Sequence, residues 1–180
     1  MTDILLLFLD VDGVFIPGPN DDGSIPATHR IAHVVPQGYT EPVKIWLAPD
    51  HGPQLLDLLN ATGLEPVWCT SWRGDASRLI GSRLGLPPWP HVSLPRLTLK
   101  TSHPHGYLWK RDHVSAHARS APFAWIDDDF AAADHDWAAR RTGAGAATLL
   151  IQPEHRVGLL PQHLHAIRMW ATAGDQRQSA

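Results

Sequence analysis

The pattern of hydrophobic and polar positions predicts a first strand that is buried on both faces. Residues 4–9 are six bulky apolar side chains in a row, without the polar alternation of a strand that has one face in solvent. The run ends at two carboxylates one residue apart, Asp10 and Asp12, and Gly13 follows them. Open parallel sheets bind ligands at the carboxyl ends of their strands, so we expect both acids at a functional crevice.

The remaining pattern predicts an α/β fold with a doubly wound (Rossmann-like), mostly parallel sheet and helices on both faces. Turn-forming residues at 17–23 precede two β-rich segments, 29–35 and 42–47, which we expect to form a hairpin flap. Beyond the flap, short apolar strands alternate with amphipathic helices, which is typical of such sheets. The expected helices are 50–63, 75–84, 109–119, 131–141 and 161–172, and the expected strands are 66–69, 123–126 and 147–151, with one short strand within 91–106.

Length and composition favour one cytoplasmic domain. We expect the domain to span 1–172, with a polar tail at 173–180. A net charge of −3 gives no electrostatic footprint for a long nucleic acid, although local arginines can hold a single phosphorylated end. The single cysteine, Cys69, excludes an intramolecular disulfide, and we find neither a signal peptide nor a membrane-spanning run.

Four segments, in order along the chain, resemble the motifs of the haloacid dehalogenase (HAD) superfamily of phosphohydrolases. Residues 4–14 resemble the first motif, and residues 65–72 resemble the second, a hydrophobic strand that ends in Thr or Ser. Lys110 resembles the third motif and residues 123–129 the fourth, a strand that ends in an acid pair. The Trp-x-Thr-Ser-Trp and Trp-Ile-Asp-Asp patterns are most similar to small capless HAD domains, some of them found in RNA-repair proteins.

The resemblance implies a role for each acid of the first motif. Asp10 would attack phosphorus and form an aspartyl-phosphate, which divides one difficult step into two easier ones. Asp12 would act as the general acid and base, and its backbone carbonyl would ligate a metal ion. Two crowded carboxylates repel each other, so a divalent cation or a shared proton is needed beside them.

The acid run at 127–129 is the second candidate for metal binding. We expect Asp127 to be a direct ligand and Asp128 to act through a water, together with Asp10 and Asp12. Hard oxygen ligands with several waters suit Mg²⁺. The alternative is that Asp128 or Asp129 caps the helix that follows, and Asp129 is the acid that we expect to be structural.

The second and third motifs supply candidates for binding and neutralising the phosphoryl group. The hydroxyl of Thr70 is expected to bind a phosphoryl oxygen, and Ser71 competes with it for this role. The resemblance implies that Lys110 neutralises the nucleophile and the phosphate. Lys100 and Arg111 are the alternatives to it.

Trp72 and Arg73 directly follow the second motif, so with Ser71 they are candidates for substrate binding at the rim of the crevice. A flat aromatic ring beside a cation can stack on a base and hold a phosphate. The alternative is that Trp72 packs on the flap.

A zinc site is the weaker metal hypothesis. His113 and His117 lie four residues apart on a predicted helix, a spacing that suits two zinc ligands. Cysteine partners and a His-Glu-x-x-His motif are both missing from the sequence, so we expect an ordinary helix surface here.

These observations predict a Mg²⁺-dependent phosphomonoesterase whose substrate is a phosphorylated small molecule or nucleic-acid end. A non-catalytic phosphate-binding module and a phosphotransferase are the alternatives on the same fold. Neither insertion point between the motifs has enough regular pattern for a separate cap domain, so we expect an open crevice.

Overall fold

The computed structural model describes residues 4–95 and 103–178 and confirms a parallel α/β sheet. The four strands lie in the order β4-β1-β5-β6, and every neighbouring pair is parallel. At the carboxyl end of the central strand, Leu9 is paired with Trp68 on one side and with Ile126 on the other. The strands are β1 (Leu6–Leu9), β4 (Glu65–Trp68), β5 (Phe123–Ile126) and β6 (Thr148–Ile151).

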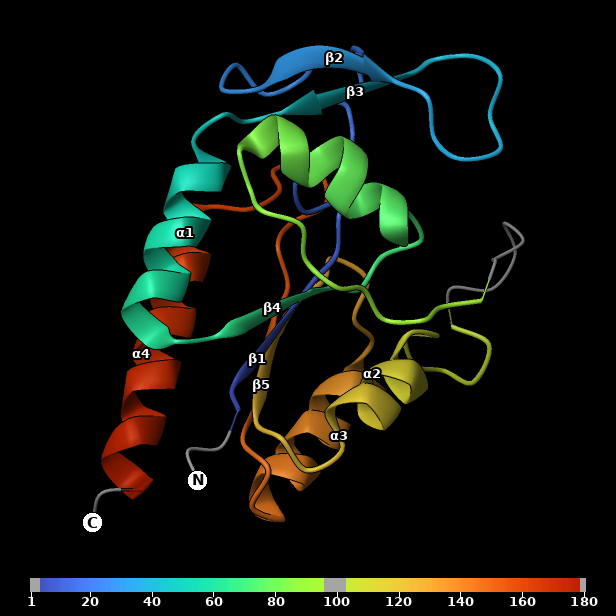
Figure 1. Cartoon of the computed structure of the whole chain (residues 1–180). Helices are drawn as coiled ribbons and strands as arrows, with labels where there is room; N and C mark the ends of the chain where they lie inside the picture. The colour runs from blue at the N-terminus through green and yellow to red at the C-terminus, as the bar shows by residue number, and fades with distance from the viewer. Residues whose placement is uncertain (1–3, 96–102, 179–180) are drawn as a thin grey trace.

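Helices cover both faces of this sheet. In Figure 1, α1 (His51–Thr62) and α4 (Pro161–Gln178) lie together on one side, and α2 (Arg111–Ala118) and α3 (Ala132–Gly143) lie on the other. The side chains of β1 alternate between two hydrophobic clusters, because successive residues of a strand point to opposite faces. Leu7 and Leu9 belong to one cluster, and Leu6 and Phe8 belong to the other. An apolar run without alternation is therefore the expected sequence for this strand.

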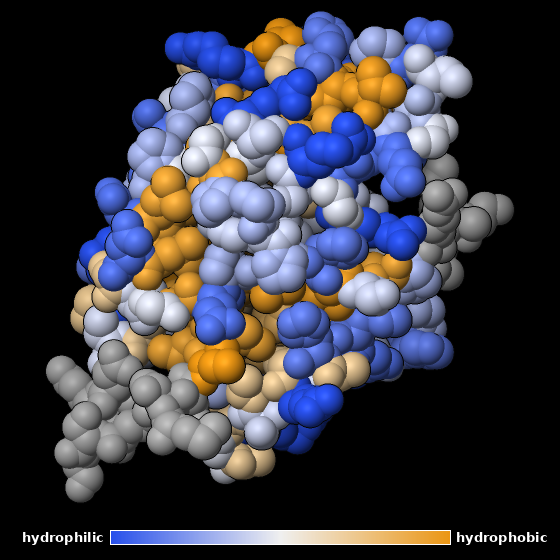
Figure 2. Space-filling model, viewed as in Figure 1, coloured by the Kyte–Doolittle hydropathy of each residue, from blue (hydrophilic) through white to orange (hydrophobic). Residues whose placement is uncertain are grey.

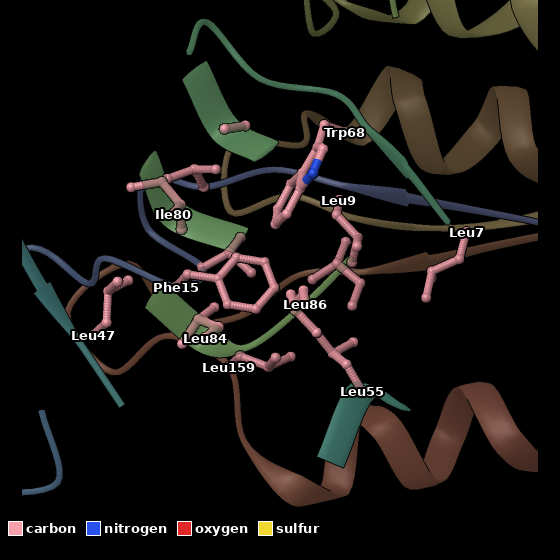
Figure 3. Packing of buried hydrophobic residues seen from close by; sticks show 14 of the residues in the cluster. Leu7, Leu9, Phe15, Leu47, Leu55, Trp68, Ile80, Leu84, Leu86 and Leu159 are labelled. Carbon is pink, nitrogen blue, oxygen red and sulfur yellow. The ribbon is translucent and has the colours of Figure 1, made fainter. Parts of the chain in front are cut away.

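An aromatic contact anchors the larger cluster beneath the carboxyl ends of the strands. The rings of Phe15 and Trp68 meet edge to face with their centroids 5.6 Å apart, and Figure 3 shows Leu9 and Leu86 beside them. Both rings are fully buried. Such pairs contribute roughly 0.5–1.5 kcal/mol beyond the burial of their area, so this contact helps to fix the loop after β1.

The predicted flap is a two-stranded antiparallel sheet, β2 (Arg30–Val34) and β3 (Val43–Leu47). It lies over the segment that follows β4 (Figure 1), and its turn is held there because the Gln37 N–H donates to Asp75 Oδ2 at 2.6 Å. Figure 2 shows hydrophobic and hydrophilic surface interleaved over this hairpin. In the described residues the flap, α1 and the short turns after β4 are the only regular elements inserted between the motifs, and they do not form a separate cap domain.

Two local predictions were wrong in detail, the helix at 75–84 and the end of the final helix. The helix expected at 75–84 is a π-helical turn, η1 (Ala76–Ile80), followed by a 3₁₀ turn, η2 (Gly81–Leu84). Gly81, at their junction, lies against Trp68, so packing onto β4 overrides the regular helical spacing. The short strand expected within 91–106 falls partly on residues 96–102, which lie outside the described residues; the described part of this range contains an isolated bridge between His91 and Trp68.

The final helix α4 continues to Gln178, six residues beyond the expected end at 172, so most of the predicted polar tail is helical. Alanine, glutamine and arginine dominate this extension, and all three are good helix formers. Of the helices in the described parts of the chain, none is long and apolar enough to cross a bilayer.

Two buried histidines join the flap to α1. His29 precedes β2 and His51 begins α1, and their ring centroids are 5.7 Å apart. His51 Nε2 lies 3.1 Å from the carbonyl oxygen of Leu159, whereas His51 Nδ1 and His29 Nε2 have no partner among the described residues. Burial, together with the neighbouring His29, lowers the pKa of His51 from 6.5 to about 4.

We therefore expect His51 to contribute a loss in the free energy of unfolding as the pH falls from 7 toward 4, in opposition to the buried acids whose pKa values are raised. The unfolded chain protonates His51 near pH 6.5 but the folded chain only near pH 4, so acid favours the unfolded state throughout this window. The difference amounts to about 3 kcal/mol for this group. Denaturant titrations near neutral pH and near pH 4.5 should show a smaller loss in His51→Gln than in the wild type. An equal loss in both proteins would contradict the assignment.

Candidate active site

Lys110 lies between two aspartates at the ends of adjacent strands. Its Nζ donates to Asp10 Oδ2 at 2.5 Å and to Asp127 Oδ2 at 2.8 Å. Asp10 follows β1 and Asp127 follows β5, and all three side chains are buried. The structure therefore brings together residues from the first, third and fourth predicted motifs.

Backbone hydrogen bonds hold these strand ends in register. The Asp10 N–H donates to the carbonyl oxygen of Ile126 at 3.0 Å, and the Asp127 N–H donates to that of Ile151 at 3.1 Å. On the other side of β1, the Cys69 N–H donates to the carbonyl oxygen of Leu9 at 2.7 Å. Because parallel strands end at one edge, residues far apart in the sequence meet there.

Asp12 directly precedes a tight turn that begins at Gly13. Gly13 has a φ of 70°, in the left-handed region that favours glycine, and its N–H donates to the carbonyl oxygen of Ile16 at 2.8 Å. The indole N–H of Trp72 contacts both carboxylate oxygens of Asp12, at 3.0 and 3.2 Å. Trp72 also packs against the larger hydrophobic cluster, so it holds the Asp12 side chain from a fixed position.

Negative charge accumulates around Lys110. Burial alone would lower the pKa of Lys110, but Asp10 and Asp127 outweigh this effect and raise it above its ordinary value. Burial raises the pKa of Asp127 well above its ordinary value, because Lys110 opposes the effect only in part and Asp10 adds to it. The pKa values of Lys110 and Asp127 both rise because one ammonium group faces two buried carboxylates.

Asp12 has the electrostatic properties of a proton-exchanging group. Desolvation of its carboxyl group by the surrounding atoms and the charge of Asp10 raise its pKa from 3.8 to about 6, although Asp12 as a whole is exposed. A carboxyl group with a pKa near the operating pH can both give and take a proton. This property fits the acid and base role expected for Asp12.

Three carboxylates could hold a divalent cation. The ligand atoms that Asp10, Asp127 and Asp128 offer lie within 4.8 Å of one another. Carboxylate oxygens are the donors that hard cations prefer, and the single positive charge of Lys110 does not neutralise three acids. The residues present therefore fit a divalent metal. The side chain of Asp12 is not part of this group, and its expected metal contact through the backbone carbonyl stays a prediction.

The other acids of the fourth motif differ in their surroundings. Asp128 Oδ2 lies 2.6 Å from His155 Nδ1, and burial raises the pKa of Asp128 while this hydrogen bond opposes the rise. Asp129 is exposed; its N–H donates to Asp127 Oδ1 at 3.2 Å, and its carbonyl oxygen lies 2.8 Å from His103 Nε2. These contacts agree with the structural role expected for Asp129.

The candidates that follow β4 are placed differently from one another. Thr70 is buried directly beyond β4, and its Oγ1 accepts a hydrogen bond from the Trp72 N–H at 3.4 Å. Ser71 is exposed. Arg73 is half-buried with a φ of 53°, and none of the described residues forms a hydrogen bond or ion pair with its guanidinium group. Because Thr70 is buried and Ser71 is exposed, Thr70 is the better candidate for the inner hydroxyl.

The segment just before Lys110 is anchored by a buried carboxylate that the sequence did not single out. Asp134 is fully buried; its Oδ2 accepts hydrogen bonds from the N–H groups of Leu108 and Ala131, both at 2.9 Å. Arg111 contacts the same side chain at 3.5 Å and stacks on Tyr107, so it points away from Asp10. Of the two alternatives to Lys110, Arg111 thus has another partner, and Lys100 lies outside the described residues.

The histidine pair on α2 makes ring contacts. His113 meets Trp109 edge to face at 6.4 Å, and His117 meets Phe8 at 5.6 Å. In the described part of the chain, the group of three acids is the one cluster of potential metal ligands, and it contains no histidine. The zinc hypothesis gains no support from this arrangement.

The functional contacts that sequence reasoning missed are Trp72 with Asp12, His155 with Asp128, and the anchoring by Asp134. The first two join residues 60 and 27 positions apart, for which the sequence carries no local signal. For Asp134 a signal exists, because an acid three residues after a helix start is typical of a capping interaction.

The four-stranded parallel sheet, covered by helices on both faces, has the Rossmann-like architecture of HAD proteins. Its edge carries the arrangement of acids around a lysine. The chain belongs to the family described as "HAD domain in Swiss Army Knife RNA repair proteins", whose sequence model matches residues 6–164. Membership of this family supports a hydrolase of the HAD type. No curated protein matches the sequence significantly.

Two solved structures resemble the chain at low similarity. One is a Legionella pneumophila protein described as a HAD superfamily hydrolase of subfamily III A, with 18% identity and a TM-score of 0.41 over 97% of this chain and 90% of that one. The other is a hypothetical protein from Xanthomonas campestris, with 18% identity and a TM-score of 0.41 over 98% of this chain and 88% of that one.

Proposed function

We propose that this protein is a Mg²⁺-dependent phosphomonoesterase that acts through an aspartyl-phosphate on Asp10. The observation that carries the proposal is the Lys110 ammonium group, which lies 2.5 Å from Asp10 and 2.8 Å from Asp127. Phosphate monoesters resist attack because their oxygens are negative, so a carboxylate nucleophile needs positive charge beside it. Lys110 supplies that charge at the carboxylate itself.

In the first step, a carboxylate oxygen of Asp10 forms a bond to phosphorus while the bond from phosphorus to the leaving oxygen breaks. Asp12 gives its proton to that leaving oxygen, and Trp72 holds the Asp12 carboxyl group in place. The Thr70 hydroxyl donates to a phosphoryl oxygen. In the second step, water attacks phosphorus, Asp12 takes its proton, and the bond to Asp10 breaks to release inorganic phosphate.

The proposed metal site consists of Asp10, Asp127 and Asp128, with the backbone carbonyl of Asp12. Bound Mg²⁺ would neutralise charge on the phosphoryl oxygens. Without it, the single positive charge of Lys110 faces three carboxylates, and burial, with the charge of Asp10 adding to it, raises the pKa of Asp127. We therefore expect activity to disappear on chelation and to return with added Mg²⁺.

The open site favours bulky phosphoesters, such as phosphorylated ends of oligonucleotides, over small sugar phosphates. Caps exclude water and select small metabolites, so a capless site has to take its selectivity from a large substrate. The Arg73 guanidinium group, next to Trp72, has no partner among the described residues and is the candidate for a second phosphate of the substrate. The family's description as a domain of RNA repair proteins agrees with this substrate class.

A comparison of kcat/KM for a 5′- or 3′-phosphorylated oligonucleotide and a sugar phosphate tests this preference. Arg73→Gln should lower the value for the oligonucleotide roughly tenfold and leave the sugar phosphate nearly unchanged, since it removes a remote charged contact. Trp72→Phe keeps an aromatic ring at this position but removes the indole N–H that donates to Asp12. It should therefore lower kcat on both substrates alike. Equal kcat/KM for the two substrates in the wild type would contradict the preference. An Arg73→Gln variant in which kcat/KM falls equally for both substrates would also contradict it.

The same assay separates hydrolysis from the two alternatives. A binding module would retain a phosphorylated ligand without releasing phosphate, and a phosphotransferase would need an added acceptor. Asp12 argues against a binding module, because mere binding does not need a carboxyl group with a pKa of about 6 beside the nucleophile. No phosphate release across a broad ester panel with Mg²⁺ would favour the binding module.

A further inference from the structure

His155 contacts the outer acid of the proposed metal site from a distant loop. It lies after β6, and its Nδ1 is 2.6 Å from Asp128 Oδ2. An ionised carboxylate only accepts hydrogen bonds, so Nδ1 carries the proton in this contact. The His155 side chain is 60% exposed and that of Asp128 only 13%, so the imidazole covers the carboxylate from the solvent side.

The loop that carries His155 is fixed to the rest of the site. The Gly18 N–H donates to the carbonyl oxygen of His155 at 2.8 Å, and the Leu159 N–H donates to that of Val14 at 2.9 Å. The Gln152 side-chain amide donates to the carbonyl oxygen of Asp128 at 3.0 Å. The loops that follow β1, β5 and β6 are therefore joined around this one contact.

Two glycines make room for the pair. A Cβ atom on Gly13 would overlap the carboxylate of Asp128, and a Cβ atom on Gly18 would overlap the imidazole of His155. Gly18 does not have a positive φ, so the space beside the imidazole, and not the backbone conformation, is what a side chain there would disturb. The loop after β1 thus forms a cradle of two glycines for Asp128 and His155.

We propose that His155 is a positioning residue that holds Asp128 in the orientation needed to bind the divalent cation. By engaging Oδ2, it leaves Oδ1 for the cation or for a water on it. Groups that hydrogen-bond to metal ligands orient them, and their loss typically weakens metal affinity or activity about 10- to 100-fold. Because most of the His155 side chain is exposed, its contact with Asp128 adds little to folding stability, so stability alone gives no reason for this contact. The inference rests on the proposed function, since it assumes the metal site.

Mn²⁺ binding, followed by electron paramagnetic resonance or calorimetry, tests the role without needing turnover. We expect His155→Ala to bind Mn²⁺ about 10- to 100-fold more weakly and to need more Mg²⁺ for half-maximal activity, with kcat at saturating Mg²⁺ changed much less. His155→Asn, whose amide can replace the Nδ1 donor, should recover most of the affinity. His165→Ala, at an exposed histidine on α4, is the matched control and should bind as the wild type does.

Gly18→Ala provides a second route, because it retains His155 but pushes the imidazole away from Asp128. It should reproduce the weakened binding of His155→Ala, with thermal midpoints of all variants close to the wild type. Wild-type affinity in His155→Ala, or no recovery in His155→Asn, would overturn the positioning role alone. A wild-type protein that binds no Mn²⁺ would overturn the metal site of the proposed function, and this inference with it.

Discussion

Replacing Asp10 by asparagine is expected to abolish turnover of phosphomonoesters, by on the order of 10⁴-fold or more. An amide oxygen is a far weaker nucleophile than a carboxylate, so no aspartyl-phosphate forms and both proposed steps are lost. The fold should remain, because asparagine has the same shape and can still accept the hydrogen bond from the Val11 N–H, now 2.7 Å from Asp10 Oδ1. In the variant, Lys110 keeps its contact with Asp127.

Initial rates with an aryl phosphate, together with circular dichroism, separate loss of chemistry from loss of fold. Asp57→Asn makes the same chemical change at an exposed position on α1 and should leave the rate unchanged. A folded Asp10→Asn protein with undiminished activity would falsify the nucleophile assignment.

Replacing Lys110 by methionine is expected to remove activity and also to destabilise the protein. Methionine fills the space but leaves the buried carboxylates of Asp10 and Asp127 facing each other without a cation. Removing one partner of a buried charge pair typically costs about 3–5 kcal/mol. The free energy of unfolding, measured with denaturant in the presence of a chelator, should fall by an amount of this order.

Mg²⁺ gives the Lys110 prediction its specific test. The variant has one more uncompensated negative charge than the wild type, so added Mg²⁺ should raise its free energy of unfolding by more than it raises that of the wild type. Lys44→Met, at an exposed lysine on β3, is the control and should respond as the wild type does. A Lys110→Met protein that is as stable as the wild type under chelation would contradict the role of the ammonium group.

The parts of the site that lie at strand ends could be predicted from the sequence. Asp10 and Asp127 each follow a short apolar run, and parallel strands bring such ends together whatever the details of the loops. The position of Lys110 needed the family resemblance, because its side chain comes from a segment before α2 without a strand pattern of its own. The flap was predicted to within a residue or two, since its turn residues and alternating pattern are local.

Contacts between distant loops could not be predicted. The sequence left open whether Trp72 offers a surface for a base or packs on the flap, and it gave no sign that the indole N–H donates to Asp12, because only the folded turn at Gly13 brings the two together. His155 lies in a loop with no repeated pattern, and its partner Asp128 is 27 residues away. The π-helical turn at Ala76–Ile80 likewise depends on packing against β4, which sequence periodicity does not record.

The most direct test of the aspartyl-phosphate mechanism is to look for a phosphoryl group on Asp10 during turnover. Protein mixed with a phosphorylated oligonucleotide and Mg²⁺ is quenched rapidly in acid, digested, and analysed by mass spectrometry. If Asp10 is the nucleophile, the peptide that contains it gains the mass of one phosphoryl group. We expect this gain to be missing in Asp10→Asn and when the metal is chelated. Steady release of phosphate from a reaction whose samples, quenched during turnover, contain only unmodified Asp10 peptide would contradict the mechanism.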